Sequence, residues 1–297
     1  MAISETEVAP ARPQTSPFWK SRKFQDRVWS ITVTIILWTG AITFLMPLFW
    51  MISTSLKSDK QVFAVPTVWV PIPPIWENYP NALTRIPFLL FLRNSLITSL
   101  IPVVGAVLSA SIVAYSFARL RWPGRNFWFL VLIATMMLPG QVTMIPVYVI
   151  YSRIGWINTF LPLTVPWFFG GAFYIFLLRQ FFLSIPSELS DAALIDGCTH
   201  PGIWWRIILP LSKPALITVA IFTFLLTWND FFGPLLYLRS EKLYTLQVGL
   251  QYFREQYSVE WQELMAASTV VLLPVLVIFF LGQRLFVQGI TLTGLKG

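Results

Sequence analysis

Residues 264–283 read LMAASTVVLLPVLVIFFLGQ, and no side chain in this stretch is charged. A helix of about 20 apolar residues is long enough to cross the hydrocarbon core of a bilayer. Neighbouring residues such as Val270 to Leu273 do not alternate between apolar and polar, as the strands of a membrane barrel do. The stretch therefore predicts a transmembrane helix, whose backbone groups are hydrogen-bonded within the segment.

Five more uncharged runs precede this one in the chain. They cover residues 28–56, 94–118, 126–152, 154–178 and 214–229. The run at 214–229 is short, but the chain stays mainly apolar beyond Asp230, as far as Leu236. The sequence therefore predicts an all-α integral membrane protein with six transmembrane helices.

The same pattern predicts how the chain is divided. We expect a cytoplasmic N-terminal tail at 1–27, a first transmembrane helix at 28–56, and an external proline-rich segment at 57–93. A core of five transmembrane helices follows at 94–287, with a cytoplasmic loop at 184–213 between helices four and five, and a cytoplasmic C-terminal tail at 288–297. Prolines in the external segment disfavour a long regular helix there.

The composition agrees with a membrane protein. Hydrophobic residues make up 56% of the 297 residues and charged residues 11%, and the mean hydropathy is +0.68. Soluble domains are about 25% charged. A soluble core of buried helices is the alternative, and it is disfavoured because such helices are rarely so long and so uncharged in succession. The N-terminal tail is polar and basic, so we expect an uncleaved anchor rather than a signal peptide.

Lys and Arg residues predict the orientation. With the N-terminus in the cytoplasm, 13 of them lie inside and 8 outside, and dense clusters at 20–27 and 119–125 flank helix ends. Cytoplasmic loops carry the excess of basic residues, so we expect both termini to lie in the cytoplasm. We expect the protein to reside in the cell (inner) membrane. We interpret the net charge of +8 as the result of basic residues that set the topology and attract lipid headgroups, and not as a sign of nucleic-acid binding.

The cytoplasmic loop is patterned enough to fold. Ser184 is suited to cap the start of a helix, and Gly197 to end it in the left-handed conformation. We expect a helix of about ten residues that lies parallel to the membrane surface. A second short helix is expected from Pro201 to Ile208, ended by Pro210.

The first of these helices carries small and apolar side chains. Ala192 and Ala193 are adjacent, with Leu189 and Ile195 nearby. Such a face can dock into a groove of another protein. The alternative is an ordinary amphipathic surface helix, and periodicity alone favours that alternative.

The residues of this loop resemble a known motif. Asp191-Ala192-Ala193, three residues, Gly197, nine residues and then Ile207-x-Leu209-Pro210 is similar to the EAA loop of binding-protein-dependent ABC importer permeases. Asp191 stands where that family usually has Glu, so its side chain is one methylene shorter. The resemblance implies a coupling helix that seats in a cleft of an ATPase subunit. The implied ATPase-coupling residues are Glu188, Asp191, Ala192, Ala193, Asp196, Gly197 and Pro210.

Other motifs place the chain in the carbohydrate branch of that family. Over roughly 78–297 it resembles the maltose-type inner-membrane subunit, at 94–96, 114–119, 137–141, 155–159, 227–231 and 289–297. The resemblance implies import of a sugar or oligosaccharide, with a second permease subunit in a heterodimer, two ATPase subunits and an extracytoplasmic solute-binding protein. The chain has no GxxxxGK[ST] motif, so we expect no cofactor, no enzyme activity of its own and ATP hydrolysis in a partner.

Three polar residues are candidates for the translocation pathway. Asn229 and Asp230 lie near the outer end of the fifth helix, and a place in the membrane interface is the alternative for Asp230. Gln141 follows Pro139-Gly140, an expected helix break whose freed carbonyls can line a cavity. His200 has no partner for metal binding or catalysis, and we interpret it as inert.

Three rival interpretations stay open. A secondary transporter usually shows internal repeats and ionisable residues at the membrane midplane. A membrane-embedded enzyme needs a cluster of His, Asp or Glu, whereas this chain has one His. An importer of a non-sugar solute, such as glycerol phosphate, a peptide or a polyamine, differs only in its cargo.

Overall fold

The computed structural model describes residues 22–254 and 259–294, with side-chain surroundings for 26–254 and 259–283. Helices dominate this part of the chain, and its only extended pairing is an isolated antiparallel bridge between Arg254 and Val259. The prediction of an all-α protein is therefore confirmed. The chain divides into two units, Met1–Ile52 and Ser53–Gly297.

The described part of the first unit is one long helix. Helix α1 (Arg22–Ser55) begins six residues before the expected run 28–56 and ends one residue before the end of that run. Apolar side chains are exposed along its length, among them Leu37, Trp38 and Phe44. An apolar helix with no polar face is suited to a lipid environment.

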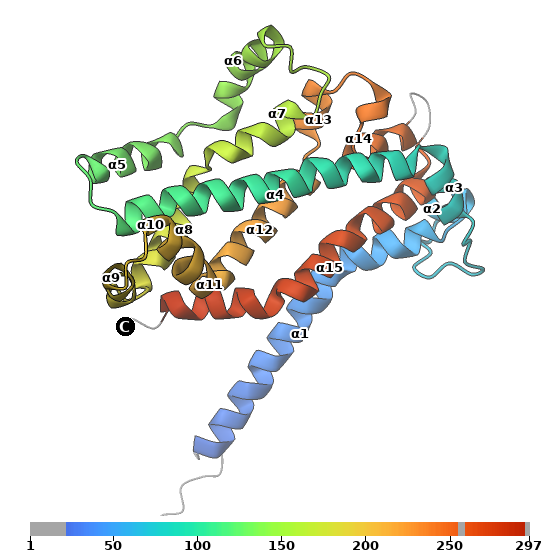
Figure 1. Ribbon diagram of the computed structural model, residues 1–297. Coiled ribbons are helices and arrows are strands. Elements are labelled where there is room, and N and C mark those ends of the chain that lie inside the picture. The colour runs from blue at the N-terminus through green and yellow to red at the C-terminus, as the bar shows by residue number, and fades with distance from the viewer. Residues whose placement is uncertain (1–21, 255–258, 295–297) are drawn as a thin grey trace, which may run out of the picture. The chain divides into compact units, whose positions relative to one another are not determined.

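The second unit is built around α4 (Phe88–Arg119), which packs against α8 (Ala172–Ser184) and α12 (Lys213–Trp228) (Figure 1). Ala106, Ala110 and Ala114 are completely buried on α4. Small side chains at this spacing let neighbouring helices approach closely, which is how helices pack in a membrane. A second cluster joins α4 and α12 to α15 (Trp261–Gly294) through Phe91, Trp228 and other side chains.

Shorter elements connect these helices. They are α2 (Asp59–Val62), α3 (Asn78–Arg85), α5 (Arg125–Thr135), α6 (Gly140–Arg153), α7 (Leu161–Thr164), η2 (Val165–Phe169), α9 (Glu188–Ile195), α10 (His200–Ile203), η3 (Trp204–Ile208), α11 (Leu209–Leu211), α13 (Phe232–Tyr237), η4 (Glu241–Leu243), α14 (Leu246–Gly249) and η5 (Leu250–Phe253).

Four described helical segments are long and apolar enough to cross a membrane: Asp26–Ser55, Phe88–Arg119, Leu161–Ser184 and Trp261–Gln283. Two bent pairs also pass this test, α5 with α6 at 95° and the segment His200–Leu211 with α12 at 81°. The count reaches six if each bent pair is one span. The predicted break at Pro139-Gly140 is confirmed, because α5 ends at Thr135 and α6 begins at Gly140 after Pro139.

The proline-rich stretch after α1 contains only the short helices α2 and α3 before α4. Helix α4 begins at Phe88, so it includes the last six residues of the expected external segment 57–93. Pro87 immediately precedes it, in a position where proline's missing N–H breaks no helical hydrogen bond. The stretch is tied to α15 by an ion pair of 3.0 Å between Arg85 and Glu263 and by a hydrogen bond from Gln262 to Asp59.

Candidate functional site

The helix of the predicted coupling loop is α9, and it begins later than expected. The prediction that Ser184 caps it is wrong, because Ser184 ends α8 and its Oγ donates to the Phe181 carbonyl at 2.7 Å. Pro186 favours an extended conformation at Ile185, which separates the two helices. Helix α9 instead starts directly after Ser187, whose carbonyl accepts hydrogen bonds from the backbone N–H groups of Ser190 and Asp191. Helix α9 therefore has eight residues.

The end of α9 is as predicted. Gly197 has φ of +80°, which is left-handed. Its N–H donates to the Leu194 carbonyl at 3.0 Å, and the N–H of Cys198 donates to the Ala193 carbonyl at 2.8 Å. These two bonds form a Schellman motif. A Cβ at Gly197 would meet nothing within 4 Å, so the glycine is required for its backbone conformation and not for space.

The second helix of the loop is longer than predicted. Helix runs without a stop from His200 to Leu211, so the prediction that Pro210 ends it is wrong. Residues Trp204–Ile208 form a π-helical turn, and the N–H of Leu209 donates to the carbonyl of Trp204. This wider turn accommodates the proline ring and its missing N–H. The chain bends only after Leu211, where α12 begins.

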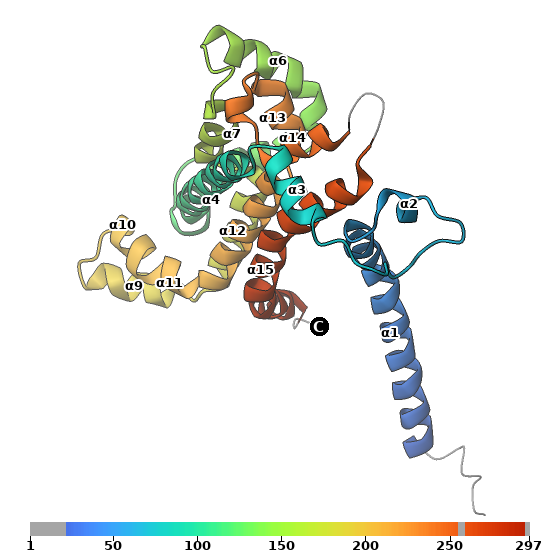
Figure 2. The same cartoon turned by 90° about the vertical axis from the view of Figure 1, so that its right-hand side faces the viewer.

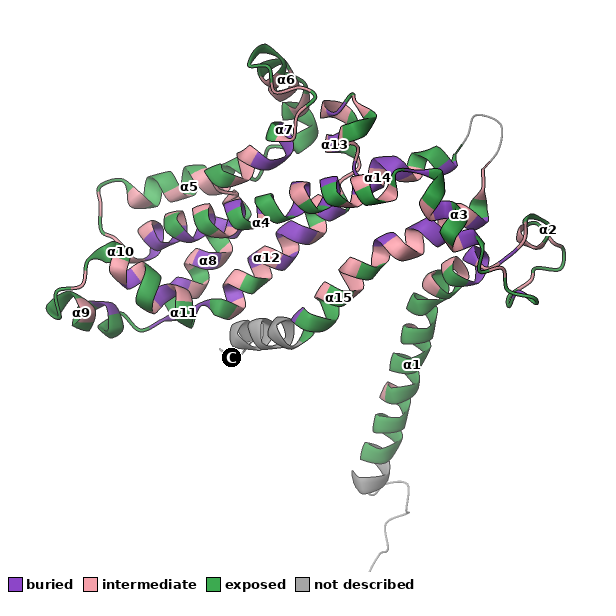
Figure 3. Ribbon diagram, turned by 45° about the vertical axis from the view of Figure 1, so that its right-hand side comes forward, coloured by how far each residue is buried: buried purple, intermediate pink, exposed green. Residues whose placement is uncertain are grey.

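Helix α9 turns most of its side chains outward, as Figure 3 shows in green. Ser190 is its only buried residue, whereas Ile195 is 87% exposed. The predicted residues Glu188, Asp191, Ala192, Asp196 and Gly197 are all exposed, and so is Pro210 in α11. Ala193 is half-buried against the core of the second unit, so the two adjacent alanines do not share one exposed face. In Figure 2, α9, α10 and α11 lie together beyond the start of α12.

An arginine connects the main helices to this loop. Arg119 is the last residue of α4, and its Nη2 donates to the carbonyls of Phe182 at 2.6 Å and Ile185 at 2.5 Å. These carbonyls belong to the end of α8, where the helix dipole is negative. Arg119 therefore links the end of α4 to the end of α8, directly before the chain enters α9.

A second arginine makes the reciprocal contact. Arg179 of α8 donates from its Nε to the Phe117 carbonyl near the end of α4, at 3.4 Å. Its guanidinium lies 4.0 Å from the ring centroid of Phe129 in α5, a cation–π contact. Helices α4, α5 and α8 are therefore joined by two half-buried cations. Sequence reasoning missed both roles, since only the place of Arg119 in the 114–119 motif marked it.

His200 has a partner in α4. Its Nδ1 lies 3.3 Å from the hydroxyl of Tyr115, which is buried. This contact fixes the start of α10 against α4, so the histidine is part of the loop's attachment. The described residues contain no group of His, Cys, Asp and Glu that could hold a metal.

The three candidate pathway residues are not brought together. Asp230 lines a cavity of about 150 Å³ with Thr98, Trp167, Thr227 and Tyr237, among others. Its Oδ1 accepts from the N–H of Gly233 at 3.0 Å, so it also fixes the start of α13.

The other two lie outside this cavity. Asn229 is exposed, and its Nδ2 donates to the Leu225 carbonyl at 2.8 Å, at the end of α12. Gln141 is exposed in the first turn of α6. Of the three, only Asp230 therefore lines a cavity of the second unit.

Comparisons with known proteins identify the family. Residues 103–292 match the family described as "Binding-protein-dependent transport system inner membrane component". The arabinooligosaccharides transport system permease protein AraQ of Halalkalibacterium halodurans is 37% identical over 204 residues, which are 69% of this chain and 73% of that protein. The sn-glycerol-3-phosphate transport system permease protein UgpE of Yersinia enterocolitica is 31% identical over 264 residues, 86% of this chain and 94% of that one.

A solved structure has the same fold. It is the crystal structure of a bacterial ABC transporter involved in the import of the acidic polysaccharide alginate. The TM-score is 0.79 at 25% sequence identity, and the match covers 91% of this chain and 99% of that one. With the matched residues 103–292 covering most of the described helices, this chain belongs to the family of inner-membrane components of binding-protein-dependent transport systems.

Proposed function

We propose that this chain is a permease subunit of an ATP-driven importer, that it forms half of the pathway for a sugar or oligosaccharide, and that α9 couples it to a separate ATPase. The observation that carries the proposal is the exposed helix α9, which ends in a Schellman motif and directly follows the end of α8 that Arg119 of α4 holds. Family membership and the arabinooligosaccharide and alginate relatives support it.

The coupling function is assigned to the residues that α9 and its flanks expose. Apolar Ile195 and Leu189 suit a groove, and Glu188, Asp191 and Asp196 add negative charge at its edge. ATP-driven closure of two ATPase subunits would move α9, and the bonds of Arg119 would carry that movement into α4 and α8. The change between inward-open and outward-open states is a population shift, set by the difference in nucleotide affinity between the two states.

The topology that fits this function has six spans and both termini in the cytoplasm, as the basic residues predict. Its support is that Arg119, Arg121 and Arg125 lie at the junction of α4 and α5, beside the end of α8 that leads into α9. Each bent pair then counts as one span. The partners are a second permease subunit, two ATPase subunits and an extracytoplasmic solute-binding protein.

The lining of the Asp230 cavity favours a neutral polyol over a phosphate ester. Its residues include hydroxyl groups, two aromatic rings and one carboxylate, but no Lys or Arg among the described residues that line it. A phosphate ester there would face an uncompensated negative charge. Glycerol phosphate, the cargo in the name of UgpE, is therefore the second candidate.

Co-purification tests the coupling function. Ile195→Asp places a charge on the most exposed apolar side chain of α9, and it should abolish co-purification of the ATPase with the tagged chain. Ile154→Asp is the matched control, because Ile154 is also exposed but follows α6. Unchanged co-purification of the ATPase with the α9 variant would overturn the assignment.

A further inference from the structure

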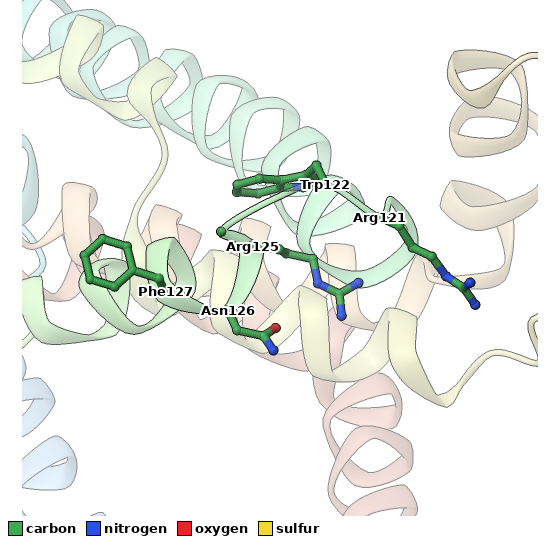
Figure 4. A pocket seen from close by; sticks show the side chains of 6 residues that line it. Arg121, Trp122, Arg125, Asn126 and Phe127 are labelled. Atoms are coloured by element: carbon green, nitrogen blue, oxygen red, sulfur yellow. The ribbon is translucent and has the colours of Figure 1, made fainter.

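The turn between α4 and α5 contains a cavity that the transport function does not use. It has a volume of about 290 Å³ and is lined by Arg121, Trp122, Gly124, Arg125, Asn126 and Phe127. Figure 4 shows the guanidinium groups of Arg121 and Arg125 and the amide of Asn126 on one side of this turn. We propose that this cavity binds the phosphate group of an anionic phospholipid.

The charge of this cavity is positive and uncompensated. In the described part of the chain, neither Arg121 nor Arg125 forms an ion pair with a carboxylate. The sequence explains why, since no Asp or Glu occurs between Glu77 and Glu188. Two guanidinium groups with free N–H donors are suited to bind phosphate oxygens.

The backbone adds to this positive charge. Helix α5 starts at Arg125 after Gly124, which has φ of +79° and lends no side chain to cap the helix. The first N–H groups of an uncapped helix attract anions, in line with the helix dipole. Arg125 is held in place by a bond of 3.0 Å from its Nη1 to the Leu120 carbonyl, which leaves its other N–H groups for a ligand.

The neighbouring surface identifies the source of the phosphate. Phe127, Trp128 and Leu130 follow the cavity along α5 and are exposed to 62%, 55% and 67%. Helix α5 is half of a bent segment that is apolar enough to span a membrane. A phospholipid bound here would place its phosphate on the arginines and its acyl chains along this apolar face. Trp128 next to the cavity is typical of the membrane interface.

The turn that contains the cavity is packed against the end of α4, close to the contacts that Arg119 makes with α8. The Trp122 ring lies 5.5 Å from that of Phe117, and Arg119 precedes the turn by two residues. A lipid phosphate in the cavity therefore binds near Arg119, which holds the end of α8 directly before α9. The lipid site goes beyond the proposed import function, and its test does not depend on cargo.

The test measures bound lipid. The full-length chain, in the complex with which it purifies, is titrated in detergent with phosphatidylglycerol or phosphatidylcholine, and lipid adducts are counted by native mass spectrometry. We expect phosphatidylglycerol to bind in preference to phosphatidylcholine. The double variant Arg121→Gln, Arg125→Gln should lower the affinity for phosphatidylglycerol about 30-fold, since each basic side chain near the surface contributes a factor of about five.

Two controls keep the result interpretable. Arg93→Gln with Arg153→Gln removes the same charge from exposed arginines outside the α4–α5 turn and should leave the affinity unchanged. The single variant Arg121→Gln changes only an exposed side chain, so it should fold normally and lower the affinity about fivefold. Equal losses in both double variants would overturn the proposal.

A competition experiment distinguishes a lipid-binding site from a site for soluble anions. Inorganic phosphate is added to the complex during the titration with phosphatidylglycerol. We expect it not to displace the lipid at equal concentration, because it lacks contacts with the apolar face of α5. Displacement at equal concentration, or phosphate adducts without any lipid preference, would show a site for soluble anions and overturn the proposal.

Discussion

The substitution Gly197→Val tests whether the end of α9 is needed for coupling. A β-branched residue in the left-handed conformation costs about 1–2 kcal/mol, and the structure adds no steric cost because nothing lies within 4 Å of the new Cβ. The two Schellman bonds from Gly197 and Cys198 are expected to break as the backbone relaxes. With Ser190 as the only buried residue of α9, little packing energy opposes this change.

The expected result is a loss of coupling with the membrane fold intact. A cost of 1–2 kcal/mol lowers the ratio of docked to undocked conformations by a factor of about 5–30. ATP hydrolysis stimulated by the binding protein and its cargo should therefore fall, at most by that factor, in reconstituted vesicles. Gly197→Asn is the matched control, because Asn tolerates the left-handed conformation and should retain most of the stimulation.

The two variants together can refute the reasoning. Equal stimulation in Gly197→Val and in the unaltered protein would mean that the conformation of Gly197 is not needed for docking. An equal loss in Gly197→Val and Gly197→Asn would instead mean that any side chain at this position is harmful. In that case the backbone argument would be wrong.

Two further predictions concern the helices behind the loop. Arg119→Lys keeps the charge but ends in a compact ammonium on a flexible stem, which does not hold a nitrogen at the position from which Nη2 bonds both α8 carbonyls. It should therefore lower stimulated ATP hydrolysis and the Tm, whereas Arg206→Lys, at an exposed position, should change neither. Gly105→Ala places a Cβ 2.7 Å from the Phe168 ring, which should cost about 1–3 kcal/mol of stability and lower the Tm of the complex. Gly140→Ala, which meets nothing within 4 Å, is its control, and an equal effect of both alanines on the Tm would contradict the packing argument.

Local sequence signals predicted several elements well. Four of the six uncharged runs overlap the long apolar helices, and the other two fall on the bent pairs, because burial in lipid tolerates few charges over about 20 residues. Gly197 and Pro139 marked a helix end and a break, since each restricts the backbone in a way that does not depend on distant residues. The prediction of an exposed α9 also came from local pattern.

Other features depend on contacts that no local pattern shows. Ser184 and Ser187 are equally good caps by composition, and the apolar residues of α8 decide between them by extending that helix. Pro210 ends a helix only where the preceding turn is α-helical, and the π-turn at Trp204–Ile208 removes the conflict. The partners of Arg119 lie more than 60 residues away, so its bonds to α8 could not be read from spacing.

The candidate pathway residues illustrate the same limit. Asp230 is a candidate from the sequence because ionisable residues near a span are often functional. The structure gives it a local bond to Gly233 as well as a place in a cavity. Asn229 is a helix-capping side chain, and Gln141 is exposed. A pathway between two subunits is defined by both of them, and one sequence specifies only its own half.

Cross-linking from α9 tests the coupling function most directly. The variant Ala192→Cys, with Cys198→Ser to remove the native thiol, places a single cysteine on the exposed side of α9. In inside-out membrane vesicles that contain the whole complex, a short thiol-reactive cross-linker should join this chain to the ATPase subunit. No cross-linked product in those vesicles, together with labelling of the cysteine by an impermeant reagent applied from outside intact cells, would contradict the account.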